Sequence, residues 1–242
     1  MNAASVDAGG PPSLVRITIR RSAATGRFFL VYGSAISVVL GVALAFSGGS
    51  AFASSFSLFL PVFAVVGSMG ALTVFTTDRM KGVLEYLMAY GVTPRRLFAN
   101  VLLATIVLVT IVLCVGVGVG VGVYAANGHP LSLSLAESIG LYGIPMGYAS
   151  AAFCAILGMF WTSLSSPAQG LNSPIGLAPL IGIIPPMATV AVIAVVAATI
   201  APGTTVLDLI GIAAVIVVTV VVLVLLSLTG RLLARERLLS PA

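Results

Sequence analysis

Long apolar stretches separated by short polar loops dominate the chain. Six stretches each run for about 20 residues or more, the length that crosses about 30 Å of hydrocarbon as an α-helix. No Asp, Glu, Lys, Arg or His lies inside them except Asp208, at the edge of the last stretch. We predict membrane-spanning helices at about 28–47, 56–77, 97–126, 138–164, 174–200 and 208–230.

The pattern within these stretches favours helices over the strands of a membrane β-barrel. Barrel strands alternate apolar and polar residues over about ten positions, whereas these stretches are apolar on all sides. Composition agrees with a membrane protein, since 60% of the residues are hydrophobic and only 7% are charged. So few charges cannot cover the surface of a soluble domain. The expected fold class is an all-α integral membrane protein with one transmembrane domain, residues 1–242.

Basic residues indicate how the chain lies in the membrane. All 11 occur before the first span, between the second and third spans, or after the sixth. Because Lys and Arg concentrate in cytoplasmic loops, both termini are predicted to be cytoplasmic, in the cell membrane. We attribute the net charge of +5 to anionic lipid headgroups and not to nucleic acid.

Proline placement predicts a break in the fifth stretch. Pro174, Pro179, Pro185 and Pro186 lie in an otherwise apolar run, and each proline kinks a helix or removes a backbone donor. Irregular backbone at membrane depth is tolerated only inside protein or along a water-filled cavity. We therefore expect a re-entrant segment before the sixth span, within about 174–203.

A glycine repeat marks the third stretch. In "VGVGVGVGV", residues 115–123, the glycines are Gly116, Gly118, Gly120 and Gly122. A phosphate-binding P-loop is excluded because it needs Gly-Lys-Ser/Thr, whereas the sole lysine, Lys81, precedes Gly82. In a helix the glycines form two pairs four residues apart, a spacing that lets membrane helices pack closely. Helix packing is the predicted role.

The spans contain no residues for proton relay or for general acid and base chemistry. Intramembrane ionisable groups mark ion and proton pathways, and the predicted spans have none between their ends. We therefore expect neither an enzyme nor a proton-coupled transporter, and no catalytic residue or metal site. Energy for uphill transport would come from another chain.

One charged segment interrupts this pattern, "TTDRMKGVLEYLMAYGVTPRRLFAN" at residues 76–100. Good helix formers run from 78 to 90, and Gly91 stands where a helix stop is expected. Thr93 and Pro94 read as the N-cap and first position of the third span. The segment is predicted as a surface helix at about 78–91. One interpretation is an interfacial helix whose basic residues bind lipid headgroups.

A second interpretation rests on a resemblance. The segment resembles the motif E-R-x-x-G-T-L-E-x-L, followed by P-x-S, of ABC transporter permeases of the type-2 exporter class. The matching or neighbouring residues are Asp78, Arg79, Lys81, Gly82, Glu85, Leu87, Gly91, Thr93, Arg95 and Arg96. Asp78 and Glu85 stand for the two acids and Thr93 for the serine. Gly91 departs from the family, which usually has proline there.

The resemblance implies a coupling helix that docks onto a separate ATPase subunit, which would bind the ATP and Mg²⁺. It also implies the type V fold, an amphipathic elbow helix at 13–27 and a second permease, identical or related. The implied function is export of a hydrophobic or amphipathic cargo. Two alternatives stay open: a haem-exporter-type permease of cytochrome maturation, and a membrane scaffold or assembly protein that transports nothing.

Overall fold

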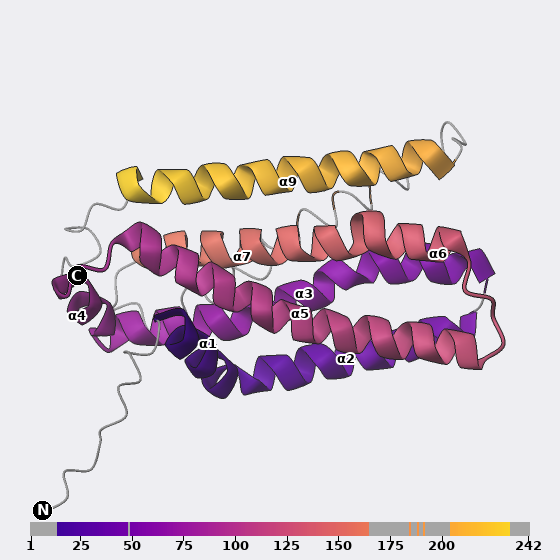
Figure 1. Ribbon diagram of the computed structural model, residues 1–242, viewed down its shortest axis with the longest axis horizontal. Helices are drawn as coiled ribbons and strands as arrows, with labels where there is room; N and C mark the ends of the chain where they lie inside the picture. The colour runs from indigo at the N-terminus through magenta and orange to yellow at the C-terminus, as the bar shows by residue number, and fades with distance from the viewer. Residues whose placement is uncertain are drawn as a thin grey trace, which may run out of the picture.

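The computed structural model describes residues 14–47, 49–164 and 204–232, together with the single residues 184, 188 and 191. Every regular element in these ranges is a helix (Figure 1). The elements are α1 (Leu14–Thr25), α2 (Arg27–Ser47), α3 (Gly49–Met80), α4 (Val83–Ala89), α5 (Pro94–Ala126), α6 (Leu133–Glu137), the π-helix η1 (Ser138–Gly143), α7 (Ile144–Leu164) and α9 (Thr204–Leu232).

Five helical spans in the described ranges are long and apolar enough to cross a membrane. They are Arg27–Phe46, Phe56–Met80, Pro94–Ala126, Leu135–Phe160 and Leu209–Leu228. These overlap the first four predicted spans and the sixth. The predicted fifth span at 174–200 and the re-entrant segment lie outside the described residues. The chain is a multi-pass membrane protein.

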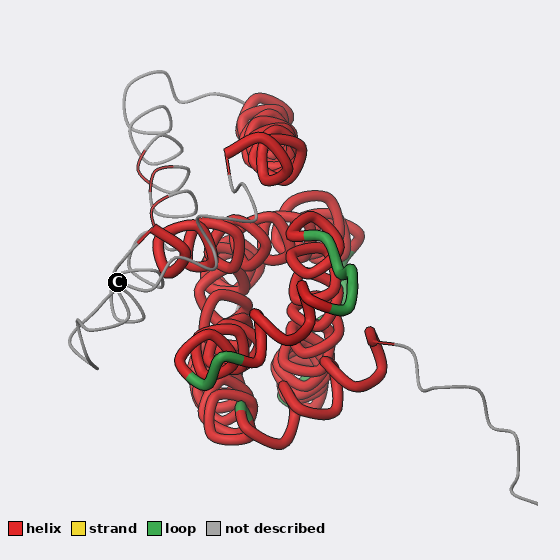
Figure 2. The backbone as a smooth tube through the Cα atoms, turned by 90° about the vertical axis from the view of Figure 1, so that its left-hand side faces the viewer, coloured by secondary structure: helices red, strands yellow, loops and turns green. Residues whose placement is uncertain are grey.

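The spans form an elongated bundle. Helices α2, α3, α5 and α7 run along its long axis and pack against one another, as the end-on view of Figure 2 shows. Helix α9 lies along one side, where it contacts α7 and α5. Of the five spans, those of α3 and α7 are the most buried and that of α9 the least. Helix α9 thus presents most of its apolar surface outward, as expected for a lipid-facing helix.

Two hydrophobic clusters fill the bundle, one toward each end. In the first, the Phe98 ring meets Phe75 and Phe160 edge-on, with ring centroids 5.5 and 5.6 Å apart. Both Leu84 and Met88 of α4 are buried in the same cluster. The second cluster surrounds Phe56, Leu60, Phe63 and Val112 of α3 and α5. The first cluster supports the end of the bundle at which α4 lies.

Helix α1 falls within the predicted elbow segment at 13–27. Its Ser22 side chain is buried against the bundle, whereas Arg16 and Arg20 are exposed. Directly after α1, Gly26 lies against Gly70 of α3. A Cβ added at Gly26 would lie only 3.0 Å from the Gly70 carbonyl carbon, so a larger residue would push α1 away from α3.

The four glycines of the α5 repeat have two different environments. A Cβ added at Gly116 would lie 2.9 Å from the Ser37 Cβ on α2, and one at Gly120 would lie 2.7 Å from the Phe56 ring on α3. No described atom lies within 4 Å of a Cβ added at Gly118 or Gly122. Close packing among the described helices therefore depends on the first pair, while the second pair faces open space.

This contrast gives a first prediction. Gly120→Leu is expected to destabilise the fold by about 1–3 kcal/mol, because its side chain must displace the buried Phe56 ring. The matched control Gly118→Leu is expected to stay within about 0.5 kcal/mol of the parent protein. Thermal unfolding of the purified proteins in detergent compares the two. Equal losses in both variants, or no loss in Gly120→Leu, would contradict the packing derived from the structure.

Candidate functional site

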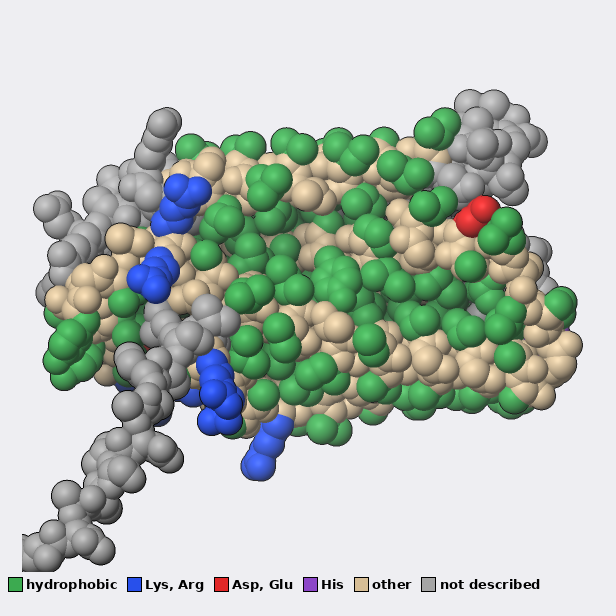
Figure 3. Space-filling view, in the orientation of Figure 1, with side chains coloured by type: hydrophobic (Ala, Val, Ile, Leu, Met, Phe, Trp, Pro, Cys, Tyr) green, Lys and Arg blue, Asp and Glu red, His purple; other side chains and the backbone are tan. Residues whose placement is uncertain are grey.

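Basic side chains gather at one end of the bundle, where α1 and α4 meet the adjoining ends of α3 and α5. Figure 3 shows Lys and Arg side chains at this end of the visible face, beside the apolar surface of the spans. The residues concerned are Arg16, Arg20, Arg21, Arg27, Arg79, Lys81, Arg95 and Arg96. We call this part of the molecule the basic end. It combines cationic side chains with α4, a short helix that lies between the spans of α3 and α5.

The segment predicted as one helix at 78–91 is divided in the structure. Asp78 and Arg79 belong to the last turn of α3, which ends at Met80, and α4 covers only Val83–Ala89. The division occurs because Gly82 adopts the left-handed conformation, with φ of 70°. Most residues with a Cβ avoid this region, whereas glycine enters it at little cost. A helix of seven residues therefore replaces the predicted longer one.

Helix α4 ends in a complete Schellman motif. The Gly91 N–H donates to the Met88 carbonyl at 3.0 Å, and the Val92 N–H donates to the Leu87 carbonyl at 3.1 Å. Gly91 has φ of 84°, as the C′ position of this motif requires. Helix α5 then begins with Pro94 at its first turn, and the Thr93 hydroxyl accepts from the Arg96 N–H at 3.3 Å. The C-terminal end of α4 and the start of α5 are thus fixed by local hydrogen bonds.

The two faces of α4 differ in chemistry. Leu84 and Met88 are buried in the core, whereas Tyr86 and Tyr90 are 65% and 73% exposed. The tyrosine rings lie 4.9 Å apart and their hydroxyls 3.2 Å apart. This hydrogen bond with Tyr86 raises the pKa of Tyr90 above its ordinary value. The outer face of α4 therefore carries a pair of tilted aromatic rings, and exposed Lys81, Arg95 and Arg96 adjoin it in sequence.

Asp78 does not lie on that outer face. Only 7% exposed, it forms a bidentate ion pair with Arg21 of α1. The Arg21 Nη1 donates to Asp78 Oδ2 at 2.9 Å, and Nη2 donates to Oδ1. The resemblance placed Asp78 among the partner-facing residues, and the structure instead gives its carboxylate a partner within the chain. Sequence reasoning missed Arg21, which is one of four arginines before the first span with nothing in its spacing to distinguish it.

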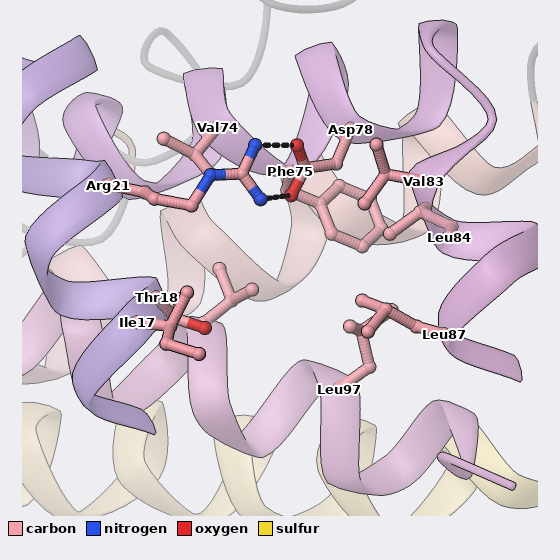
Figure 4. Close-up of a pocket in the computed structure, with 11 residues that line it drawn as sticks. Ile17, Thr18, Arg21, Val74, Phe75, Asp78, Val83, Leu84, Leu87 and Leu97 are labelled. Carbon is pink, nitrogen blue, oxygen red and sulfur yellow. Dashed lines mark hydrogen bonds and ion pairs between the residues drawn. The ribbon is translucent and has the colours of Figure 1, made fainter. Parts of the chain in front are cut away.

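A pocket of about 140 Å³ lies beside this ion pair, between α1, α4 and the adjoining ends of α3 and α5 (Figure 4). Its walls are mainly apolar, with Thr18, Arg21 and Asp78 as the polar lining residues. The side chains of Val83, Leu84 and Leu87 bring one face of α4 to the pocket. Packing between α1 and α4 is therefore incomplete.

Leu87, Arg79 and Glu85 were also predicted to belong to this site. Leu87 is half-buried on the pocket side of α4, and Arg79 is half-buried at the end of α3. Glu85 lies within α4, but its side chain is outside the described part of the structure. Its predicted role toward a partner stays a prediction.

Hydroxyl groups within the spans bond mainly to their own helices. Ser37 donates to the Ser34 carbonyl, Thr73 to the Met69 carbonyl and Thr105 to the Val101 carbonyl. Such bonds satisfy the hydroxyl locally. Among the described residues, no group of three or more His, Cys, Asp or Glu could hold a metal ion.

Comparison with known proteins gives no match to this chain. No family model matches it, and neither a curated protein nor a solved structure is significantly similar.

Proposed function

We propose that this chain is the membrane-spanning permease subunit of a type-2 ABC exporter of the type V fold. It would move a hydrophobic or amphipathic cargo across the cytoplasmic membrane, driven by ATP hydrolysis in a separate subunit. The proposal rests on α4, a short helix between two spans that carries an exposed aromatic pair on its outer face. In this proposal α4 is the coupling helix.

The chemistry of that face supports docking to another protein. Tyr and Arg are enriched among the residues that contribute most to protein interfaces, while interface centres exclude most other charges. The rings and hydroxyls of Tyr86 and Tyr90 already contact each other, so docking would cost little ordering of their side chains. Leu84 and Met88 fix the opposite face in the core, so a force on α4 would be transmitted to α3 and α5.

An ATPase is the class of partner that the sequence favours. The chain has no P-loop, because its single lysine is followed by glycine and not by Ser or Thr. The predicted spans also lack the ionisable groups of an ion-coupled pump between their ends. Energy would therefore enter through docking, with ATP and Mg²⁺ bound by the partner. A second permease, identical or related, would complete the pathway.

Purification from the native membrane tests the proposal. An affinity-tagged chain, extracted in mild detergent, should retain a protein with a Walker A motif in stoichiometric amount, together with Mg²⁺-dependent ATP hydrolysis. A scaffold protein would retain neither. Purification without any nucleotide-binding subunit or ATP hydrolysis, under conditions that keep the chain folded, would contradict the proposed function.

Orientation gives a second prediction, because the proposal requires α4 to face the cytoplasm. In a variant without Cys114 and Cys154, His129→Cys should react with an impermeant maleimide added outside intact cells, and Lys81→Cys should not. Lys81→Cys should react only after the membrane is permeabilised. Labelling of position 81 from outside would reverse the topology and remove α4 from the compartment that contains ATP.

A further inference from the structure

The Arg21–Asp78 ion pair joins two parts of the chain that are far apart in sequence. Arg21 belongs to α1, before the first span, and Asp78 belongs to the last turn of α3, 57 residues later. The pair is bidentate, the geometry in which a guanidinium fixes both the position and the direction of a carboxylate. Figure 4 shows Arg21 extending from α1 along the pocket wall to reach Asp78.

Asp78 places the ion pair close to the turn that joins α3 to α4. Asp78 lies two residues before the end of α3, and the left-handed Gly82 follows two residues after that end. Directly after α1, five residues beyond Arg21, Gly26 packs against Gly70. Residues 21 and 26 thus each contact α3, and the ion pair lies on the last turn of α3, just before the turn from which α4 begins.

The pocket shows why α4 needs this support. Val83 and Leu87 face a space of about 140 Å³ between α4 and α1 and are only half-buried. A helix packed on one side and bounded by two glycines with positive φ has room to tilt toward this space. The turn that precedes it is held by the ion pair on the pocket wall.

We infer that Arg21 is a positioning residue for α4: through Asp78 it fixes the last turn of α3 and thereby the direction in which α4 presents Tyr86 and Tyr90. The positioning itself follows from the contacts within this chain. Its consequence for partner docking rests on the proposed function. Arg21 would contact no partner and would act through Asp78.

Hydrogen exchange measured by mass spectrometry on the whole protein in detergent tests the positioning without a partner. In Arg21→Gln, amides of residues 83–89 should exchange about tenfold faster, the factor expected on losing one charged hydrogen bond. Amides of residues 104–113 in α5 should keep the exchange rate of the parent protein. The matched control Arg20→Gln, one residue away and exposed, should change neither segment. Unchanged exchange in 83–89, or an equal increase in both segments, would overturn the inference.

Charge reversal is a second test of the Arg21–Asp78 ion pair. The double variant Arg21→Asp/Asp78→Arg should restore the slow exchange of residues 83–89 that Arg21→Asp alone loses, because the pocket beside position 78 offers room for the longer side chain. Failure of the double variant to improve on Arg21→Asp would overturn the pairing as the cause.

If Arg21→Gln loosens α4 while partner-stimulated ATP hydrolysis stays at the parent level, the positioning stands and the docking consequence is wrong.

Discussion

Phe98→Ala is expected to lower the melting temperature of the protein by about 10 °C. The ring is fully buried and lies between Phe75 and Phe160, so its loss removes two edge-on aromatic contacts and leaves a cavity. Truncation of a buried phenylalanine costs about 3–5 kcal/mol, and each kcal/mol corresponds to about 2–4 °C for a chain of this size. The effect should concentrate at the basic end, because Leu84 and Met88 of α4 pack in the same cluster.

Phe28→Ala is the matched control for this prediction. The Phe28 ring is 66% exposed on α2, so its truncation should change stability by no more than about 0.5 kcal/mol. Thermal unfolding followed by tryptophan fluorescence or by loss of the monodisperse elution peak compares the two variants. Similar melting temperatures for the Phe98 and Phe28 variants would show that the aromatic cluster does not support the basic end.

Tyr86→Ala/Tyr90→Ala is expected to abolish stimulated ATP hydrolysis by the complex while leaving the permease folded. Both rings are exposed, so their removal opens no cavity in the core. Central aromatic residues of an interface cost about 2 kcal/mol or more each when truncated, which is about thirtyfold in affinity for each residue. The double variant should therefore retain its melting temperature and lose most of its bound ATPase.

Tyr32→Ala serves as the control for that variant, because its ring is 51% exposed on α2 and lies away from α4 in sequence. Its ATPase retention should equal that of the parent protein. If the double variant still binds the full amount of ATPase, α4 is not the docking element.

The membrane-spanning helices could be predicted from sequence because one physical requirement dominates them. A span of lipid needs about 20 apolar residues in a structure that satisfies its own backbone, and that requirement is local in sequence. The predicted stretches at 28–47 and 97–126 accordingly overlap α2 and α5 to within a few residues. The N-cap at Thr93 could also be anticipated, because capping involves residues three apart.

The division between α3 and α4 was predicted wrongly because helix propensity alone did not reveal the conformation of one glycine. A glycine inside a helix costs only about 1 kcal/mol, so Gly82 alone did not require a break. Tertiary packing favours the turn, because Leu84 and Met88 directly after it are buried in the aromatic cluster. The burial of Leu84 and Met88 thus involves residues that are distant in sequence, Phe98 and Phe160 among them.

The ion pair between Arg21 and Asp78 could not be predicted from the sequence either, because the two residues are far apart along the chain. Asp78 matches an acid of the permease motif, and motif position alone assigns it to the partner-facing side. The structure shows that its carboxylate is used within the chain, by an arginine 57 residues away. The glycine repeat illustrates the same difficulty, because identical spacing places Gly120 against a buried ring and Gly118 against open space.

Photo-crosslinking from the exposed face of α4 tests the central claim most directly. A benzoyl-phenylalanine replaces Tyr86 or Tyr90 in the full chain, the native membranes are illuminated, and the adducts are identified by mass spectrometry. Docking of an ATPase onto α4 predicts one principal adduct, with a protein that contains a G-x-x-x-x-G-K-[ST] motif. The same residue placed at Tyr32 should not produce that adduct. Adducts with lipid alone, or with a protein that has no nucleotide-binding motif, would contradict the claim that this chain is energised by an ATPase bound at α4.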